Sequence, residues 1–554
     1  MNRYRMNMMR VAAATAVLVA VSVAAGGTAQ ALVSPFDLRQ LTAAAQTVVV
    51  AQVASVGSHW TSGAQPTIVT DVDLRVGQVL KGRAGASLRL RAAGGRVGPV
   101  AVLVSDAPRF VAGETYVLFI DSAGQVVDGS YGAPQVIGGR VPALGDSLGG
   151  VAARVAQSAG REPLVRRSLP ATAATVAPSQ AAGSPDGGPV IGAVSPKAAP
   201  AGVGARVTIT GSGFGIEQGL GRVLFFAAAG QQGLDARIVS WSDTRIVCRV
   251  PIGSIAEMDA PSSGPVHVIT NDGQTSNDVQ FAVVFSFDKA QWAVPTCTYR
   301  VSRRFPAGVA AAVAAAAQTW NAAGTTFQFV DGGTCGAGSV LGDGHNDIVW
   351  ATGLPAGYSA VTSTLTVGSC IVEADTKLNA SVTWGDATAD GSVTDVQTIV
   401  LHELGHWLGL RDLYGQGDAD KVMYGARGAG DIARALAPAD QAGKRWIYGP
   451  TRWDVSPPTT VAQSAAGAQN GYVRLRFKVV DGPYTCGAAK VTVFIKSGKT
   501  LVPWLSLDGV PTNTWQRPRV KCALAAGTYR FAVSATDMAG NKQVGMTFRT
   551  LTVQ

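Results

Sequence analysis

Charged residues and histidines are scarce in this sequence of 554 residues. Asp, Glu, Lys and Arg make up 15% of the chain and there are only five histidines, whereas glycine occurs 67 times. The basic residues give a formal net charge of +10, but they are scattered and form no stripe with aromatic side chains. This pattern argues against nucleic-acid binding. The length exceeds what one hydrophobic core organises, so we expect several domains rich in β-structure and turns.

Long apolar runs are also rare, and the clearest one lies near the N-terminus. Three arginines precede an apolar segment at 11–25, and small residues follow it around Ala31. This order is typical of a secretory signal peptide, which we expect at 1–31 with cleavage after Ala31. The segment is too short to cross a bilayer comfortably, and no apolar run near the C-terminus suggests an anchor. We therefore expect a secreted, extracellular protein without a membrane span.

Cysteine occurs only six times, and cysteines in an exported chain predict disulfides. Cys486 and Cys522 stand alone in the last part of the chain, so we expect them to pair. One further bond is expected in the central region, but the pattern does not decide the partners among Cys248, Cys297, Cys335 and Cys370. No two cysteines have close zinc-ligand spacing, so none is expected to bind metal.

Two of the histidines stand at a metal-binding spacing. His402 and His406 are four residues apart in the pattern H-E-x-x-H, and residues four apart share one face of a helix. Glu403 stands one step round the helix, where it can reach a water held by the metal. Gly409 favours the left-handed turn that ends a helix, so the chain can double back and bring Asp412 to the same metal. The pattern predicts His402, His406 and Asp412 as zinc ligands and Glu403 as the catalytic base.

The helix that carries these residues has signals of its own. Thr394 lies three residues before Gln397, as in a capping box, and apolar side chains follow as far as Leu408. Two alternatives stay open. The histidines could be hydrogen-bonded to backbone in a buried helix without metal. Asp418 or Asp420 could compete with Asp412 as third ligand, although their spacing does not match the motif.

The segment from His402 to Asp412 resembles the zinc-binding consensus of the metzincin metallopeptidases, H-E-x-x-H-x-x-G-x-x-(H/D). Aspartate in the last position resembles the small secreted bacterial neutral proteases of the snapalysin type. Val422-Met423-Tyr424-Gly425 resembles the Met-turn of the family, and residues 440–449 resemble the closing helix of matrixin-like catalytic domains. Upstream, residues 346–349 and 371–375 resemble its central strands. The resemblance covers about 285–449.

This resemblance implies an α+β catalytic domain over 285–452 in which Met423 lies beneath the metal. It implies a zinc-dependent endopeptidase that hydrolyses peptide bonds through a zinc-bound water activated by Glu403. A protein or peptide substrate would pair with an edge strand near Ile371. The alternative is a modular extracellular binding or adhesive protein whose metal site is structural or degenerate. The oxygen-rich loop at 342–347 is either a Ca²⁺ site or a plain polar turn.

All-β modules are expected on both sides of this domain. Residues 32–155 alternate apolar and polar positions, which predicts an N-terminal β domain, and residues 156–188 form an Ala/Pro/Ser/Gly-rich linker. Residues 189–284 resemble an IPT/TIG domain, an immunoglobulin-like sandwich, and residues 453–554 alternate again, which predicts a second immunoglobulin-like sandwich. Such modules imply spacers or surfaces that bind cell-envelope polymers.

Overall fold

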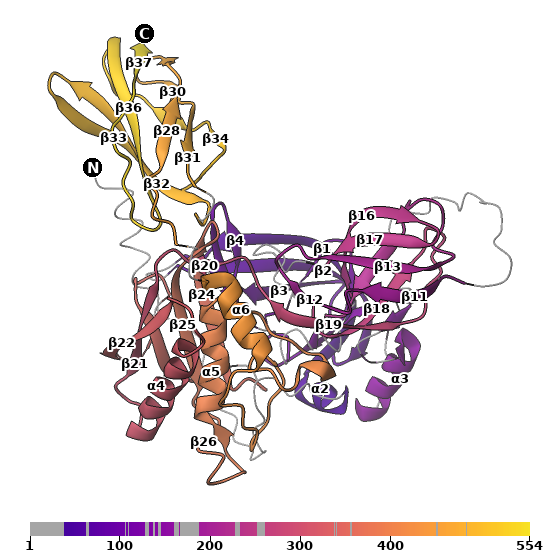
Figure 1. Cartoon of the computed structure of the whole chain (residues 1–554). Helices are drawn as coiled ribbons and strands as arrows, with labels where there is room; N and C mark the ends of the chain where they lie inside the picture. The colour runs from indigo at the N-terminus through magenta and orange to yellow at the C-terminus, as the bar shows by residue number, and fades with distance from the viewer. Residues whose placement is uncertain are drawn as a thin grey trace.

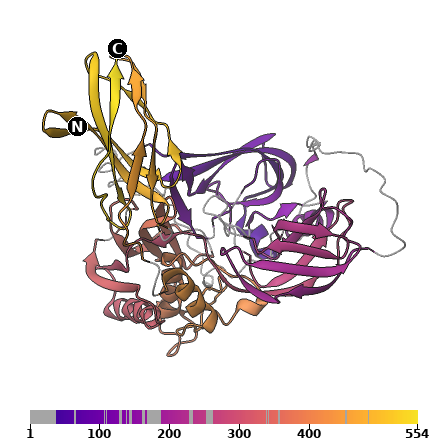
Figure 2. The same cartoon turned by 45° about the horizontal axis from the view of Figure 1, so that its top comes forward.

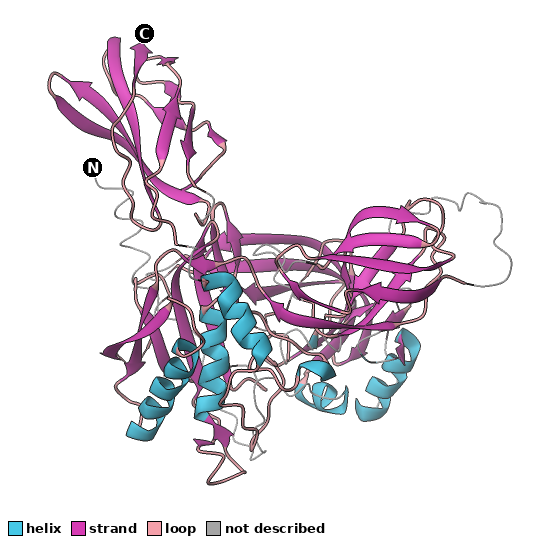
Figure 3. Cartoon of the chain, in the orientation of Figure 1, coloured by secondary structure: helices cyan, strands magenta, loops and turns pink. Residues whose placement is uncertain are grey.

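Four groups of strands follow one another along the chain in the computed structural model, and helices are few (Figure 1, Figure 3). The structure describes residues 38–159 and 188–554, with short gaps in both ranges, and the short strand β10 between them. The expected signal peptide at 1–31 and most of the expected linker at 156–188 lie outside these residues. Within the described ranges, no helix is long and apolar enough to cross a membrane. The expectation of a multidomain, mainly β protein is confirmed.

The N-terminal module is built on a sheet with the order β10-β2-β1-β6-β7, in which β3 also pairs with β2. Two helices accompany this sheet, although the alternating pattern predicts only strands. In α3, Val151 and Val155 lie four residues apart on one buried face, which explains why this segment is helical. The elements are α2 (Leu38–Ala44), β1 (Thr47–Trp60), β2 (Ile68–Lys81), β3 (Ser87–Ala93), β4 (Gly95–Val97), β5 (Val100–Val104), β6 (Thr115–Ile120), β7 (Gln135–Val136), β8 (Arg140–Val141), β9 (Asp146–Ser147), α3 (Leu148–Ala159) and β10 (Val165–Arg166).

The second module is a sandwich of two sheets, with the orders β11-β13-β17-β16 and β12-β19-β18-β14-β15. Two sheets are what the resemblance to an immunoglobulin-like sandwich implies, and their inward side chains form one core. Figure 2 shows this sandwich at the opposite end of the molecule from the C-terminal module. The strands are β11 (Val190–Ser195), β12 (Ala198–Ala201), β13 (Arg206–Ser212), β14 (Arg222–Phe225), β15 (Leu234–Asp235), β16 (Arg237–Ser242), β17 (Arg245–Arg249), β18 (Gly264–Ile269) and β19 (Val279–Ser286).

The central module is a mixed sheet with helices packed beside it (Figure 3). Its strands follow the order β22-β21-β23-β25-β24, and β24 alone among them runs antiparallel to its neighbour. The elements are β20 (Gln291–Trp292), β21 (Thr296–Ser302), α4 (Ala307–Asn321), β22 (Gln328–Cys335), β23 (Asn346–Ala351), β24 (Ala360–Val367), β25 (Cys370–Asn379), β26 (Trp384–Gly385), β27 (Thr394–Asp395), α5 (Val396–Trp407), η3 (Gln416–Asp418) and α6 (Pro438–Tyr448).

The prediction of an edge strand near Ile371 is wrong. Ile371 lies in β25, which is an inner strand paired with β23 on one side and with β24 on the other. The chain returns after β24 to insert β25 between two earlier strands, and the apolar content of a segment does not reveal such an insertion. The outer strand of this module is therefore β24, and its outer edge pairs with β5 of the N-terminal module.

The C-terminal module is a sandwich that stands apart from the other modules in Figure 1. Its two sheets have the orders β28-β31-β34 and β33-β32-β36-β37-β29-β30-β35. The strands are β28 (Thr459–Ala462), β29 (Ala465–Gly467), β30 (Tyr472–Arg474), β31 (Phe477–Val480), β32 (Ala488–Ser497), β33 (Thr500–Pro511), β34 (Trp515–Gln516), β35 (Arg519–Lys521), β36 (Gly527–Asp537) and β37 (Phe548–Val553).

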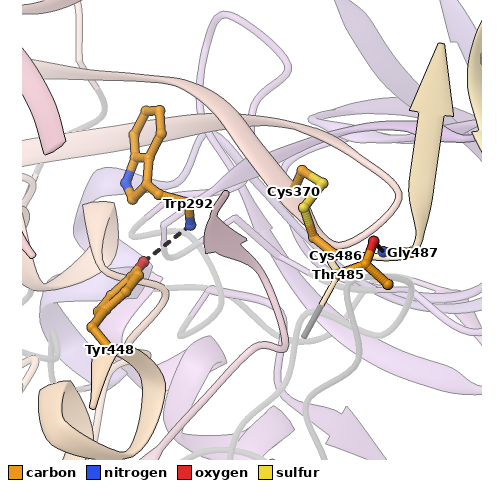
Figure 4. Close-up of a disulfide and its surroundings, with 6 residues drawn as sticks. All are labelled: Trp292, Cys370, Tyr448, Thr485, Cys486 and Gly487. Carbon is orange, nitrogen blue, oxygen red and sulfur yellow. Dashed lines mark hydrogen bonds between the residues drawn. A yellow bond between two sulfur atoms is a disulfide. The ribbon is translucent and has the colours of Figure 1, made fainter. Parts of the chain in front are cut away.

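The predicted pairing of Cys486 with Cys522 is also wrong. Cys486 forms a disulfide with Cys370, which begins β25 (Figure 4). Cys486 lies in the turn before β32 that faces the central module, where its carbonyl accepts a hydrogen bond from the backbone N–H of Ser369. Cys522 is instead a free thiol in the core of the sandwich, and Cys297 and Cys335 are free and buried. The bond therefore joins two modules.

Candidate metal centre

Helix α5 is buried along almost its whole length and carries two of the three predicted ligands, His402 and His406. Asp395, rather than Thr394, caps its N-terminus, because the Asp395 side chain accepts a hydrogen bond from the backbone N–H of Thr398. The indole of Trp320 in α4 donates to the carbonyl of Leu401 at 2.7 Å and holds the middle of the helix. As predicted, Gly409 has a positive φ of 86° just after the helix, and the chain turns back there.

The turn brings together the three residues that the sequence predicts as ligands. Oδ1 of Asp412 lies 2.9 Å from Nε2 of His402 and 3.4 Å from Nε2 of His406. The two Nε2 atoms are 3.1 Å apart. All three side chains are buried, and their ligand atoms lie within 4.8 Å of one another. Such a group of two nitrogens and one carboxylate oxygen is a donor set that zinc accepts.

Backbone carbonyls orient both imidazoles. Nδ1 of His402 lies 2.8 Å from the carbonyl oxygen of Val422, and Nδ1 of His406 lies 2.9 Å from that of Leu410. Each Nδ1 therefore donates its proton to a carbonyl, which leaves the Nε2 lone pairs directed at the shared centre. This tautomer is the one that a metal ligand requires.

The centre also favours positive charge. Burial lowers the pKa of His406, but the Asp412 carboxylate outweighs this effect and raises the pKa to about 9. Burial raises the pKa of Asp412, but His406 and His402 together hold it well below its usual value. The carboxylate thus stays ionised between the rings, and a cation at this position compensates its charge.

Glu403 lies beside the three ligands and is only 1% exposed. Its Oε2 accepts a hydrogen bond from the hydroxyl of Thr362 in β24 at 2.6 Å, and its Oε1 has no hydrogen-bond partner within the described residues. Sequence reasoning missed Thr362, because this residue precedes Glu403 by 41 positions and carries no motif. One carboxylate oxygen is therefore held in place while the other remains available for chemistry.

Met423 lies against α5 on the side of Gly405. A Cβ atom added to Gly405 would lie 2.1 Å from the sulfur of Met423, so the sulfur fills the space that the glycine leaves open. The carboxylate of Asp440 accepts hydrogen bonds from the backbone N–H groups of Val422 and Met423, at 2.9 and 3.3 Å. Asp440 is thus a positioning residue that the sequence did not reveal, since its role depends on a turn 17 residues away.

The alternative third ligands lie elsewhere. Asp418 is buried against Lys421 and Ser263, and Asp420 is exposed. Among the described residues, the other close group of three acidic or histidine side chains is Asp454, Asp481 and Asp537 in the C-terminal module.

The loop at 342–347 contributes no residue to the histidine-aspartate group at Asp412 or to the aspartate group at Asp454. The backbone N–H groups of Gly342 and Gly344 donate to the Glu373 carboxylate, and Asp347 pairs with Arg300. The calcium expectation for this loop stays a prediction.

Residues 189–283 match the family model of the IPT/TIG domain. They coincide with the two-sheet sandwich that spans β11 to β19. This segment is an IPT/TIG domain. It packs on the central module through its last strand, since β19 contacts α6, and Leu413 enters its core. No curated protein matches the chain.

Proposed function

We propose that the chain is a secreted zinc-dependent endopeptidase with a metzincin-like catalytic domain at 285–452. The observation that carries the proposal is the meeting of His402, His406 and Asp412 at one buried centre, with Glu403 beside them. The order of the central strands supports it, because an antiparallel outer strand lies next to α5, and an extended peptide could pair with the edge of this strand that β5 occupies. That strand is β24 and not the segment near Ile371.

The donor set fits zinc. Catalytic zinc sites use three protein ligands of nitrogen and oxygen type and keep a further position open. His402, His406 and Asp412 would hold the ion through Nε2, Nε2 and a carboxylate oxygen. Zinc would act as a Lewis acid that polarises a peptide carbonyl and lowers the pKa of a water molecule.

Glu403 supplies the proton transfer. Its free oxygen Oε1 accepts a proton from the attacking water and passes it to the leaving amine, while Thr362 holds Oε2. Because Asp412 is anionic, it reduces the positive charge of the site relative to a third neutral histidine. Glu403 therefore carries more of the activation of water than it would beside three histidines.

The test uses the full-length chain loaded with zinc. Glu403→Ala should keep one equivalent of zinc by elemental analysis and lose protein hydrolysis on a zymogram by a factor of about 10² to 10⁴. His402→Ala should lose both zinc and hydrolysis, and the exposed His345→Ala should keep both. A chelator should abolish hydrolysis by the wild type. Unchanged hydrolysis in Glu403→Ala would reject the proposal.

The burial of the whole site favours a second candidate function. In this alternative the chain is a modular binding or adhesive protein, and the zinc is structural. His402, Glu403, His406 and Asp412 are between 0% and 8% exposed, so the rest of the chain covers them almost completely in this arrangement. A structural site requires no carboxylate with a free oxygen, however, and Oε1 of Glu403 has no partner within the described part of the chain. This candidate predicts bound zinc without hydrolysis under any condition.

A further inference from the structure

A strand of the N-terminal module covers the outer edge of β24. Residues Val100–Val104 of β5 pair antiparallel with Val367–Ser363 of β24, so the eight-stranded central sheet includes two strands from the start of the chain. One step beyond this register, the backbone N–H of Ser105 donates to the carbonyl of Thr362 at 3.1 Å. At the other end, Gly368 donates to the carbonyl of Pro99 at 3.0 Å. The pairing therefore occupies β24 from Thr362 to its end at Val367.

The covering strand is one arm of a hairpin. β5 pairs with β4, and β4 in turn contacts β1 and β2 of the N-terminal module. Figure 1 shows β4 at the junction between this module and the central sheet, close to the labels of β20 and β24. The hairpin thus lies within the N-terminal module in the sequence, and β4 contacts other strands of that module. Its second strand, β5, nevertheless extends the sheet of the central module.

The side chains of β5 are seated in the central module. Ala101 and Leu103 are buried and belong to the same hydrophobic core as Trp407 and Met423. Ser105, which follows β5, contacts a residue of the candidate centre. Its hydroxyl accepts a hydrogen bond from the backbone N–H of Thr362 at 3.1 Å. Thr362 is also the residue whose hydroxyl holds Glu403. The strand therefore runs along the edge up to the partner of the catalytic base.

We propose that the N-terminal module, residues 38–159, is an internal inhibitor whose strand β5 occupies the peptide-binding edge of the catalytic domain. This inference rests on the proposed function. An extended peptide pairs with a sheet edge through its backbone and directs alternate side chains to the same face, and β5 pairs with β24 in this way while it buries Ala101 and Leu103. The same geometry names the substrate class: extended segments with small or aliphatic side chains at alternate positions, as at Ala101 and Leu103.

The first experiment undocks the hairpin in the full-length, zinc-loaded chain. Leu103→Asp places a charge in the buried core and should release β5 from β24. The matched control is Val97→Asp on β4, which is half-buried and pairs with β5 but not with β24. We expect hydrogen exchange at Ser363–Val367 and hydrolysis of a protein substrate to rise at least tenfold in Leu103→Asp, and neither to rise in the control.

A second variant protects the test against misfolding of the first. Bonded pairs alternate along an antiparallel ladder, and Ser105 and Pro99 are both bonded, so Ala101 holds a bonded position between them. Ala101→Pro removes its N–H and should give the same two increases. A synthetic peptide with the sequence of residues 99–106 should then inhibit the opened variants, and the same peptide with aspartate in place of Leu103 should not.

The outcomes separate the two proposals. Hydrolysis by the wild type that is as fast as by Leu103→Asp, with β24 still protected, would overturn the inhibitory role and leave the endopeptidase standing. Raised exchange at β24 without hydrolysis by any variant, with zinc bound, would instead overturn the endopeptidase and the role that rests on it. Unchanged exchange at β24 in both Leu103→Asp and Ala101→Pro would show that the hairpin does not cover this edge.

Discussion

Asp418 joins the IPT/TIG domain to the central module, and its removal should loosen that contact. The carboxylate is fully buried and accepts hydrogen bonds from the backbone N–H of Ser263 at 2.8 Å and from that of Gly415 at 3.1 Å. It also accepts from the ammonium group of Lys421, which donates in addition to the carbonyl of Val283. Asp418→Ala would leave Lys421 buried beside a single neutral acceptor.

The expected loss follows from this burial. Breaking a buried ion pair by removing one partner costs about 3–5 kcal/mol, because the remaining charge stays out of water without compensation. At 1.4 kcal/mol for each power of ten, the opening equilibrium of the contact should rise by roughly two to three and a half powers of ten. The exposed Asp420 offers a control, since Asp420→Ala removes no buried partner.

Amide hydrogen exchange in β19 measures this opening without assuming that the whole chain unfolds at once. Asp418→Ala should lower the opening free energy of Val279–Ser286 by about 3–5 kcal/mol, and Asp420→Ala should leave it nearly unchanged. The double variant Asp418→Leu with Lys421→Met should recover much of the loss, because it removes both charges. A loss below about 1 kcal/mol in Asp418→Ala would refute the reasoning.

Three further predictions concern the central module. Cys370→Ser breaks a cross-link between cysteines 116 residues apart and should lower the stability of the C-terminal sandwich by up to about 4–5 kcal/mol in thermal unfolding. Burial raises the pKa of Asp375 from 3.8 to about 8, so the folded chain keeps a proton that the unfolded chain loses. Stability should therefore fall as the pH rises from about 4 to 8, and denaturation of Asp375→Asn at each pH should show no such fall. Gly405→Ala places a methyl group against the sulfur of Met423 and should cost about 1–3 kcal/mol and weaken zinc binding in a competition titration.

Each of these predictions has its own control. Cys370→Ser should melt like the reduced wild type and should not change further with reductant. A pH profile of Asp375→Asn identical to that of the wild type would assign the pH dependence to other groups. Gly308→Ala is matched to Gly405→Ala, because Gly308 is also helical but the added carbon would meet no atom within 4 Å beyond its chain neighbours and the backbone of its own helix, and it should be neutral or stabilising. Equal effects of the two alanines would contradict the role given to Met423.

The sequence predicted the local geometry of the candidate centre because short-range rules govern it. The period of a helix places His402 and His406 on one face whatever surrounds them. The turn at Gly409 extends this local rule as far as Asp412, and the structure places the carboxylate within 2.9 Å of a histidine nitrogen. The alternation of apolar residues likewise indicated strands in the N-terminal and C-terminal modules.

The sequence did not predict which strands pair with each other. It also did not predict the residues that support the candidate centre. Thr362, Asp440 and the Cys370–Cys486 bond act across separations that no local pattern records. An acceptor oxygen or a thiol identifies its partner only through proximity in the folded chain.

What the sequence by itself determined is therefore the set of candidate metal ligands and the kinds of module that surround them. Only the tertiary structure decided that β5 closes the edge of β24, where Ser105 meets Thr362 across 257 residues. The physical reason is that every β-strand presents the same row of backbone donors and acceptors. Which strand fills an open edge depends on how whole modules pack, and that information lies in no single segment of the chain.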